Sequence, residues 1–335
     1  MKAYVLRETN GPESLKLEDF DLGTIKPNEV CIKVKAASLN RRDFFITHGM
    51  YPGMSLPSIL GSDGAGEIVE VGEEVNELSV GDEVIINPSL NWGERDDICS
   101  EQFNVLGMPQ NGTFAEFIIV HKENVKKKPS YLSWSEAAAI PLAALTAYRA
   151  LFTRGGLTET DTVLIPGIGS GVALYALQIA SSLGAKVIIT SSSDEKIEKA
   201  KKLGAVAGFN YKDQDWFKKL RKEIGMVNLT IDGVGGESFN RLIDVTAQGG
   251  RIVSYGATNG VVPNTVLPKI FFKNMDIRGT TMGSPREFEQ MLAFFEKHNI
   301  KPVIDSVYSF SDLQKALIHM GEGHQFGKIA IEFSL

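Results

Sequence analysis

Three closely spaced glycines form the clearest candidate for ligand chemistry in this chain. Gly167, Gly169 and Gly171 follow a short apolar run, Thr162–Ile165, and precede a longer apolar stretch, Val172–Leu183. The run predicts a buried strand, and the stretch predicts a helix lying on a sheet face. Bare glycine backbone at a helix N-terminus favours a phosphate, because unpaired N–H groups and the helix dipole meet there. The pattern therefore indicates the phosphate-binding turn of a dinucleotide site.

The glycine loop departs from the G-x-G-x-x-G pattern, because the third glycine position, counted from Gly167, holds Val172. A tight strand–helix turn in another doubly wound protein would look similar. A complete strand–helix–strand unit favours the dinucleotide, since its second strand ends in the polar cluster Ser191–Ser193, where a ribose is expected. The candidate cofactor-binding residues from this unit are Gly167, Gly169, Ser170, Gly171, Val172, Ser191, Ser192 and Lys196.

The residue at the end of the second strand bears on which dinucleotide is bound. NAD enzymes usually place a carboxylate there to hold the ribose hydroxyls, and that carboxylate would repel a 2′-phosphate. This chain has Ser191, with Ser192 and Lys196 as possible phosphate donors. The sequence therefore predicts a preference for NADPH (NADP), although Asp194 and Glu195 partly offset the positive charge. Alternatively, Ser193 only caps a helix and Lys196 is only an exposed helix residue.

The elements around this unit predict two domains. After the glycine loop, strands alternate with helices, which predicts a six-stranded, doubly wound parallel sheet. Residues 1 to about 120 are rich in short strands and predict a small, irregular β-barrel. Residues 87–112 have little periodicity, so they form either a long functional loop or a mobile one. Residues after about 284 are not needed for the six-stranded sheet, so we expect them to return to the first domain.

The composition is that of an ordinary globular protein of 335 residues with a net charge of −6. The mixed charges give no reason to expect nucleic acid as a partner, and no run is long enough to cross a membrane. The N-terminus reads as a strand without a signal peptide. Two cysteines, Cys31 and Cys99, cannot form a disulfide framework and suit a reducing compartment. A cytoplasmic location is therefore expected.

Many ordered sequence blocks carry a resemblance to a known family. The N-terminal blocks are Ala36–Asp43 (AASLNRRD), His48–Pro52 (HGMYP), Pro57–Gly66 (PSILGSDGAG) and Gly81–Asp82; later blocks are Glu136–Pro141 (EAAAIP), Leu145–Tyr148 (LTAY), Gly249–Val253 (GGRIV) and Gly327–Ile329 (GKI). Together they make the chain resemble the medium-chain dehydrogenase/reductase superfamily, and within it the zinc-independent quinone oxidoreductase-like branch.

The resemblance implies an α/β fold with two domains and an active site in the cleft between them. A GroES-like, β-rich catalytic domain would comprise residues 1–122, completed by 285–335. A Rossmann doubly wound domain would comprise residues 123–284. The resemblance also adds Tyr211 to the candidate donors for the 2′-phosphate. It further implies a homodimer, which the predicted edge strand Met275–Thr280 could support by pairing with a symmetry mate.

The resemblance also indicates where zinc would bind. Zinc-dependent members have Cys where Asn40 stands and His where Ser62 stands, and their four-cysteine structural lobe falls within residues 87–112, which hold only Cys99. Three thiolate or imidazole ligands are the usual minimum for a catalytic zinc. We therefore expect no metal. The relay hydroxyl of the zinc alcohol dehydrogenases falls at Arg42, which puts that route of proton transfer in doubt.

Without a metal, the acceptor that best suits this pattern is a quinone or an α,β-unsaturated carbonyl compound, because conjugation spreads the developing negative charge. The resemblance supplies Asn40 and Tyr51 as candidate catalytic hydrogen-bond donors, with Asp43 orienting their loop. Each also has a structural interpretation: Asn40 could cap a turn, Tyr51 could be a packing aromatic, and Asp43 could be an N-cap.

Two other functions remain open from the sequence. One is an alcohol dehydrogenase or aldehyde reductase of the same superfamily that uses an unrecognised metal geometry. The other is a non-catalytic NADPH-binding protein, because a fold alone does not fix a function. The physiological small-molecule carbonyl substrate is not specified by the sequence.

Overall fold

The computed structural model describes residues 1–333, which form two compact units. One contains Met1–Ala143 and the chain from Gly283 onward, and the other contains Ala144–Met282. The sequence places the boundaries after residues 122 and 284, so the first boundary lies later in the structure. The reason is helix α2 (Trp134–Ala138), which packs against strands β3 (Glu29–Ser38) and β5 (Asp63–Val71) of the first unit.

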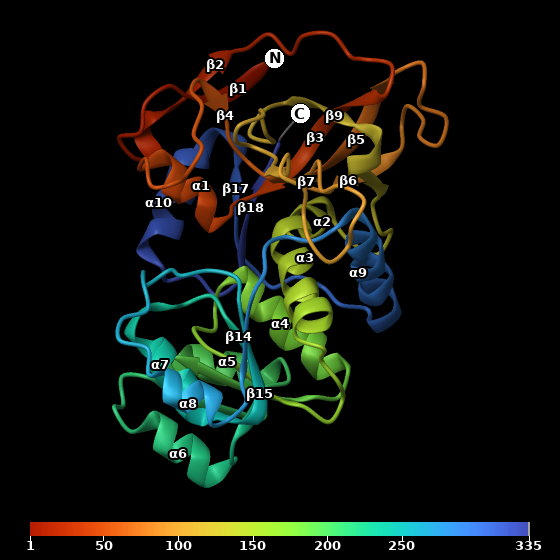
Figure 1. The fold of residues 1–335 in the computed structure, drawn as a ribbon. Coiled ribbons are helices and arrows are strands. Elements are labelled where there is room, and N and C mark those ends of the chain that lie inside the picture. The colour runs from red at the N-terminus through yellow and green to blue at the C-terminus, as the bar shows by residue number, and fades with distance from the viewer. Residues whose placement is uncertain (334–335) are drawn as a thin grey trace. The chain divides into compact units, whose positions relative to one another are not determined.

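The first unit is built on a seven-stranded sheet with the order β10-β6-β5-β3-β18-β17, and β9 also pairs with β3. Its other strands are β6 (Glu83–Ile86), β9 (Phe117–His121), β10 (Val125–Lys127), β17 (Ile304–Ser309) and β18 (Lys328–Glu332). Figure 1 shows the C-terminal strands, in blue, beside the red N-terminal strand β3, and β18 pairs with β3 in antiparallel fashion. The C-terminal segment thus completes the sheet of the N-terminal segment.

A smaller sheet and four helices complete the first unit. The sheet has the order β2-β1-β4, with β1 (Lys2–Leu6), β2 (Leu15–Asp19) and β4 (Ser58–Ile59). The other helices are α1 (Arg41–Thr47), α9 (Pro285–His298) and α10 (Leu313–Glu322). Alternate residues Val30, Ile32 and Val34 of β3 enter the same buried core as Leu313 and Leu317 of α10. This core fixes the end of β3, from which α1 begins.

The second unit is a six-stranded parallel sheet with the order β13-β12-β11-β14-β15-β16. Its strands are β11 (Thr162–Ile165), β12 (Lys186–Ser191), β13 (Ala207–Asn210), β14 (Val227–Asp232), β15 (Thr246–Ser254) and β16 (Asp276–Gly279). Its helices include α4 (Gly171–Ser182), α5 (Asp194–Lys202), α6 (Trp216–Glu223), α7 (Phe239–Val245) and α8 (Leu267–Phe271). The predicted doubly wound α/β class is confirmed. Because the strands are parallel, their carboxyl ends all meet at one edge of the sheet.

Residues 87–112 are held by their own contacts. Two short strands, β7 (Ser89–Leu90) and β8 (Asn104–Val105), pair within the segment. The buried Trp92 indole N–H donates to the Arg95 carbonyl at 2.8 Å, and its ring packs edge-on against Phe103. Within the described residues, no helix combines the length and apolar character that a membrane crossing requires.

Candidate functional site

The glycine loop of the second unit joins β11 to α4. Gly167 and Gly169 have φ angles of 66° and 124°, a region that favours glycine. A Cβ added at Gly167 would lie 2.8 Å from a methyl group of Val234, so the loop also needs glycine there for space. Ser170 caps α4, because its hydroxyl accepts from the Ala173 N–H. The loop therefore presents the N-terminal turn of a twelve-residue helix, including Gly171 and Val172, at the carboxyl edge of the sheet.

The remaining candidate cofactor residues gather at the ends of β12 and β13. Ser191 is buried at the end of β12, and its carbonyl accepts from the Tyr211 N–H at 3.0 Å. Ser192 follows Ser191 and is partly exposed. Ser193 caps α5 by accepting from the Lys196 N–H, as the structural interpretation of the sequence expects. The structure thus brings Ser191, Ser192, Lys196 and Tyr211 to one end of two neighbouring strands.

Tyr255 is a further side chain at this edge. It follows β15, and its hydroxyl forms a hydrogen bond with Ser170 of the glycine loop. Its ring lies against Gly233, since a Cβ added there would lie 2.3 Å from the ring. Burial raises the pKa of Tyr255 far above its ordinary value. The phenol therefore stays protonated and links the loop after β15 to the loop after β11.

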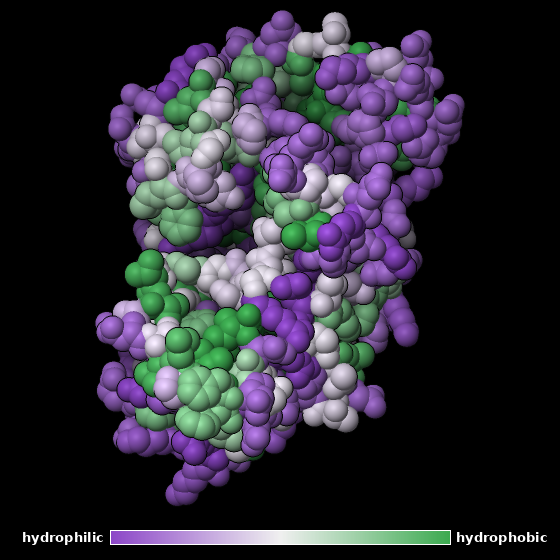
Figure 2. Space-filling model, in the orientation of Figure 1, coloured by the Kyte–Doolittle hydropathy of each residue, from purple (hydrophilic) through white to green (hydrophobic). Residues whose placement is uncertain are grey.

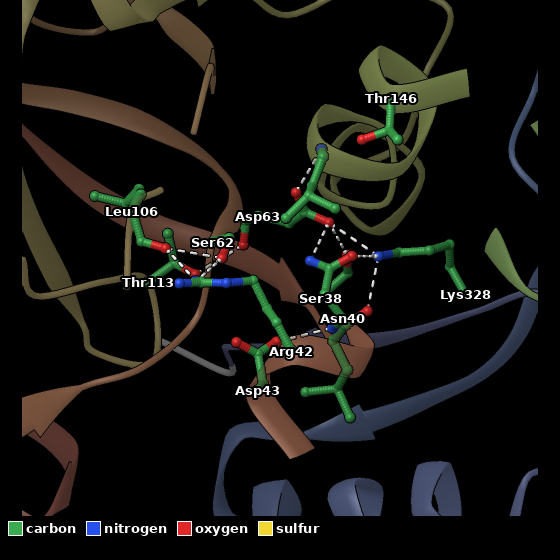
Figure 3. Close-up of polar contacts among 12 residues, drawn as sticks. Ser38, Asn40, Arg42, Asp43, Ser62, Asp63, Leu106, Thr113, Thr146 and Lys328 are labelled. Atoms are coloured by element: carbon green, nitrogen blue, oxygen red, sulfur yellow. Dashed lines mark hydrogen bonds and ion pairs between the residues drawn. The ribbon is translucent and has the colours of Figure 1, made fainter. Parts of the chain in front are cut away.

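The first unit contains a buried polar cluster centred on Asp63, which begins β5. Figure 3 shows Ser38, Asn40 and Lys328 pointing toward its carboxylate. The Ser38 hydroxyl, the Asn40 amide and the Lys328 ammonium each donate to Asp63 Oδ2 at 2.9 Å. The other oxygen, Oδ1, accepts from the Leu142 N–H at 2.8 Å. The fully buried carboxylate is therefore neutralised by one cation and held by three neutral donors.

In Figure 3, Arg42 lies on the side of the cluster opposite to Lys328. Its guanidinium donates to the Ser62 hydroxyl at 2.6 Å and to the Leu106 carbonyl at 2.8 Å. It also stacks on the Tyr51 ring, 5.0 Å from the ring centre, and its Nε lies 3.4 Å from the Tyr51 hydroxyl. Tyr51 is thus positioned by Arg42. In the described part of the chain, no hydrogen bond joins Tyr51 to Asn40.

Asn40 and Asp43 occupy the first turn of α1. Asn40 is the N-cap, as its structural interpretation expects, and Asp43 is at the third helical position, so it is not the N-cap. The Asp43 carboxylate accepts from the Asn40 backbone N–H at 2.8 Å and thereby orients the loop that carries Asn40. Burial raises the pKa of Asp43 to about 6, against the opposing effect of Arg42. Its second oxygen is buried without a hydrogen-bond partner.

We predict that Asp43 makes stability depend on pH. The folded chain binds its proton up to about pH 6, whereas an ordinary carboxyl group releases it near 3.8. The folded state therefore loses stability as pH rises from about 4 to 6. Asp43→Asn keeps an acceptor for the Asn40 N–H but has no charge to bury. The free energy of unfolding of Asp43→Asn minus that of the wild-type chain should therefore increase by about 3 kcal/mol between about pH 4 and pH 6. Each pKa unit corresponds to about 1.4 kcal/mol.

Urea unfolding of both proteins at several pH values between 4 and 7 measures this difference. The comparison across pH removes any constant cost of the new amide. A difference that stays flat across the window would show that the Asp43 carboxyl titrates normally.

Comparison with known proteins decides the family. A family model described as "Alcohol dehydrogenase GroES-like domain" matches residues 26–130, and one described as "Zinc-binding dehydrogenase" matches residues 171–297. The zinc-type alcohol dehydrogenase-like protein YogA of Leptosphaeria maculans is 38% identical over 91% of each chain. The chain belongs to the medium-chain dehydrogenase/reductase superfamily.

Two further relatives are named as different kinds of enzyme. An acryloyl-coenzyme A reductase of Sulfurisphaera tokodaii is 31% identical and covers 99% of this chain and 100% of its own. The crystal structure of an NAD-dependent alcohol dehydrogenase is 36% identical, with a TM-score of 0.94 and 99% of both chains covered. The predicted GroES-like and Rossmann-type fold is therefore confirmed along almost the whole chain.

The zinc-ligand positions of the superfamily do not suit a metal in this chain. The family resemblance implies that Asn40 and Ser62 occupy them, and no group of three His, Cys, Asp or Glu side chains in residues 1–333 is arranged to hold an ion. The acceptors that are present already bind the chain's own cations: Lys328 contacts Asp63 and Asn40, and Arg42 contacts Ser62. Zinc would have to displace two positive charges and bind without any thiolate or imidazole. The donor set therefore does not fit zinc.

Four residues that the structure places in these sites are not among the candidates from the sequence. Asp63 and Lys328 both lie in sequence blocks that carry the family resemblance, and that was a usable signal. From the sequence, Arg42 stands out only because it occupies the position of the relay hydroxyl group in the zinc alcohol dehydrogenases. Tyr255 gave no signal, because its link to Ser170 depends on the neighbouring positions of β15 and β11 around β14.

Proposed function

We propose that this protein transfers a hydride from NADPH to a quinone or an α,β-unsaturated carbonyl compound without zinc. One observation carries the proposal. Where relatives of this superfamily would bind a metal, this chain has the Asn40 amide and the Ser62 hydroxyl group, contacted by the side-chain cations Lys328 and Arg42. An amide N–H can stabilise a delocalised negative charge, whereas a localised alkoxide usually requires a metal or a strong acid.

The glycine loop fits a dinucleotide. Gly167 and Gly169 leave room for close approach, and the N-terminus of α4 attracts a pyrophosphate. Ser191, Lys196 and Tyr211 lie at the strand ends where the adenosine ribose is expected. When bound, the reduced nicotinamide supplies a hydride. The chain's own contribution is to hold the dinucleotide and to place donors at the acceptor's oxygen, for which Asn40 and Tyr51 are the candidates.

The relatives support both this reaction and one rival. The acryloyl-coenzyme A reductase is named for an acyl group in which a double bond is conjugated with a carbonyl. The relatives named as alcohol dehydrogenases favour reduction of a simple aldehyde or oxidation of an alcohol. The rival would need a strong acid or a metal at the oxygen. Neither is supplied by the donor set around Asn40 and Ser62.

A matched pair of acceptors tests the proposal. Crotonaldehyde and butanal have the same number of carbons and differ by one conjugated double bond. NADPH oxidation should be fast with crotonaldehyde, or with a simple benzoquinone, and negligible with butanal. Equal or greater rates with butanal would favour the alcohol dehydrogenase. Tight NADPH binding without turnover of any acceptor in a broad panel would favour a non-catalytic binding protein.

We further predict a preference for NADPH over NADH, because the buried residue at the end of β12 is Ser191 and not a carboxylate. Ser191→Asp should reverse the preference, since its charge would repel the 2′-phosphate and could hold the ribose hydroxyls. Lys196→Ala should raise the KM for NADPH about 10-fold or more and leave the KM for NADH unchanged, because hydrogen bonds to charged groups contribute about 1.5–3 kcal/mol.

Lys202→Ala is the matched control, since Lys202 is an exposed lysine at the other end of the same helix. Steady-state kinetics with both cofactors measure the ratio of kcat/KM values. A wild-type chain that uses NADH as efficiently as NADPH, with no effect of Lys196→Ala, would refute this cofactor assignment.

We also propose a homodimer formed through the sheet edge of the second unit. Strand β16 is the last strand of the sheet, and within residues 1–333 it pairs only with β15. Apolar side chains are exposed in β16 and in the segment around α8 that precedes it, namely Ile277, Leu267, Phe271 and Phe272. Figure 2 shows hydrophobic surface, in green, over α8 and the loop before it. A second copy could pair with β16 about a two-fold axis and cover these side chains.

Sedimentation at micromolar concentration measures the mass, and we expect that of a dimer. The double variant Leu267→Asp/Phe272→Asp should be monomeric. Val80→Asp, at a similarly exposed apolar position in the first unit, should remain dimeric. A wild-type monomer would contradict the proposal.

A further inference from the structure

Lys328 is a buried cation beside the candidate donor Asn40. It is 4% exposed at the start of β18. Its ammonium donates to the Leu39 carbonyl at 2.7 Å, to Asn40 Oδ1 at 2.8 Å and to Asp63 Oδ2 at 2.9 Å. An ammonium has three protons and no acceptor, so these contacts use it completely. Lys328 can therefore affect a bound molecule only through a neighbouring residue.

Asn40 is the neighbour that can transmit the effect. Its Oδ1 accepts from Lys328, and its Nδ2 donates one proton to Asp63. These two contacts fix the orientation of the amide, because a flipped amide would place N–H groups against an ammonium and an oxygen against a carboxylate. Within the described residues, only Asp63 accepts from Nδ2. One Nδ2 proton therefore remains for another acceptor.

We propose that Lys328 is a positioning residue that fixes and polarises the Asn40 amide, so that its remaining N–H is presented to the oxygen of the carbonyl acceptor. This inference rests on the proposed function. The ammonium withdraws electron density through Oδ1, and chains of hydrogen bonds in a water-poor interior strengthen one another. The N–H then becomes a better donor to an oxygen that gains negative charge. A positive charge thus assists the reaction without contacting the substrate.

A purely structural role for the ion pair is the competing explanation. Removal of Lys328 alone would leave the Asp63 carboxylate unpaired, so that variant could lose activity by misfolding. The double variant Lys328→Met/Asp63→Asn removes both charges and keeps an acceptor at residue 63. Lys126→Met/Glu289→Gln is the matched control, because it also removes both charges of an ion pair in the first unit but lies outside the polar cluster.

The kinetic test uses crotonaldehyde at saturating NADPH. In the double variant kcat should fall about 10-fold, since charge assistance roughly doubles the strength of a hydrogen bond, while KM should change less than twofold. Lys126→Met/Glu289→Gln should keep the wild-type kcat. When Asn40→Ala is already present, the double change should cause no further loss of kcat. A wild-type kcat in folded Lys328→Met/Asp63→Asn would overturn the inference. The same would follow if adding these two changes to Asn40→Ala lowered kcat by a further factor of about 10.

The side-chain amide resonances of Asn40 provide a readout without turnover. In ¹⁵N–¹H spectra, the wild-type chain and Lys126→Met/Glu289→Gln should give two separate, slowly exchanging Nδ2 protons. In Lys328→Met/Asp63→Asn these protons should exchange at least tenfold faster. Unchanged exchange would overturn the positioning role. Absence of turnover in the wild-type chain would count against the proposed function alone, because the resonances test the positioning of Asn40 separately.

Discussion

Asn40→Ala should lower kcat for a conjugated acceptor about 10²–10³-fold, the usual cost of losing a donor that acts on the transition state. The buried Asn40 amide is held by Asp63 and Lys328, so its loss removes an oriented donor and not a mobile one. The KM for NADPH should change little, because the glycine loop belongs to the other unit of the chain. Steady-state kinetics below the unfolding temperature measure both parameters.

Tyr51→Phe should also lower kcat, because it removes the hydroxyl beside the Arg42 guanidinium. Tyr131→Phe is the matched control. The Tyr131 hydroxyl donates to the Ile300 carbonyl, outside the polar cluster, so that variant should keep its kcat. If both Asn40→Ala and Tyr51→Phe reduce crotonaldehyde at the wild-type rate, these residues serve only packing and capping.

Lys328→Met should destabilise the folded chain by about 3–5 kcal/mol, because it leaves the Asp63 carboxylate buried without a counter-charge. The carboxylate is fully buried, and Lys328 is the cation that contacts it. Adding Asp63→Asn should recover most of the loss, since the remaining groups are neutral and the new side-chain amide can still accept from the Leu142 N–H. Denaturant unfolding of the two single variants and the double variant gives the coupling free energy.

The control for this coupling is an exposed ion pair in the same unit, Lys126 with Glu289. Neutralising Lys126 should cost less than about 1 kcal/mol. A Lys328→Met variant as stable as wild type would show that the pair contributes little to the fold.

Most of the fold could be predicted from the sequence because its signals are local. The strand–loop–helix at Thr162–Ser182 and the cap Ser193 depend on neighbouring residues in the chain. The short helix α1 has only seven residues, so a helical period is hard to recognise in it. The placement of α2 was also not local, since its contacts with β3 and β5 decide that it belongs to the first unit.

The candidate site could be predicted only in part. Asn40 and Asp43 were found through the family resemblance, and the capping geometry that links them follows from their spacing of three residues. Asp63 and Lys328 are 265 residues apart and meet because β18 pairs with β3, which lies beside β5. Strand order of this kind is set by the packing of the whole unit. No single stretch of sequence contains it.

The turnover of metal-free protein tests the central claim most directly, namely that the chain's own side chains replace the metal at the acceptor's oxygen. Purified protein would be treated with a strong chelator, its zinc content measured by elemental analysis, and NADPH oxidation by crotonaldehyde recorded. We predict far less than one zinc per chain and an unchanged rate. About one tightly held zinc per chain, with activity lost on its removal and restored on its return, would contradict the account.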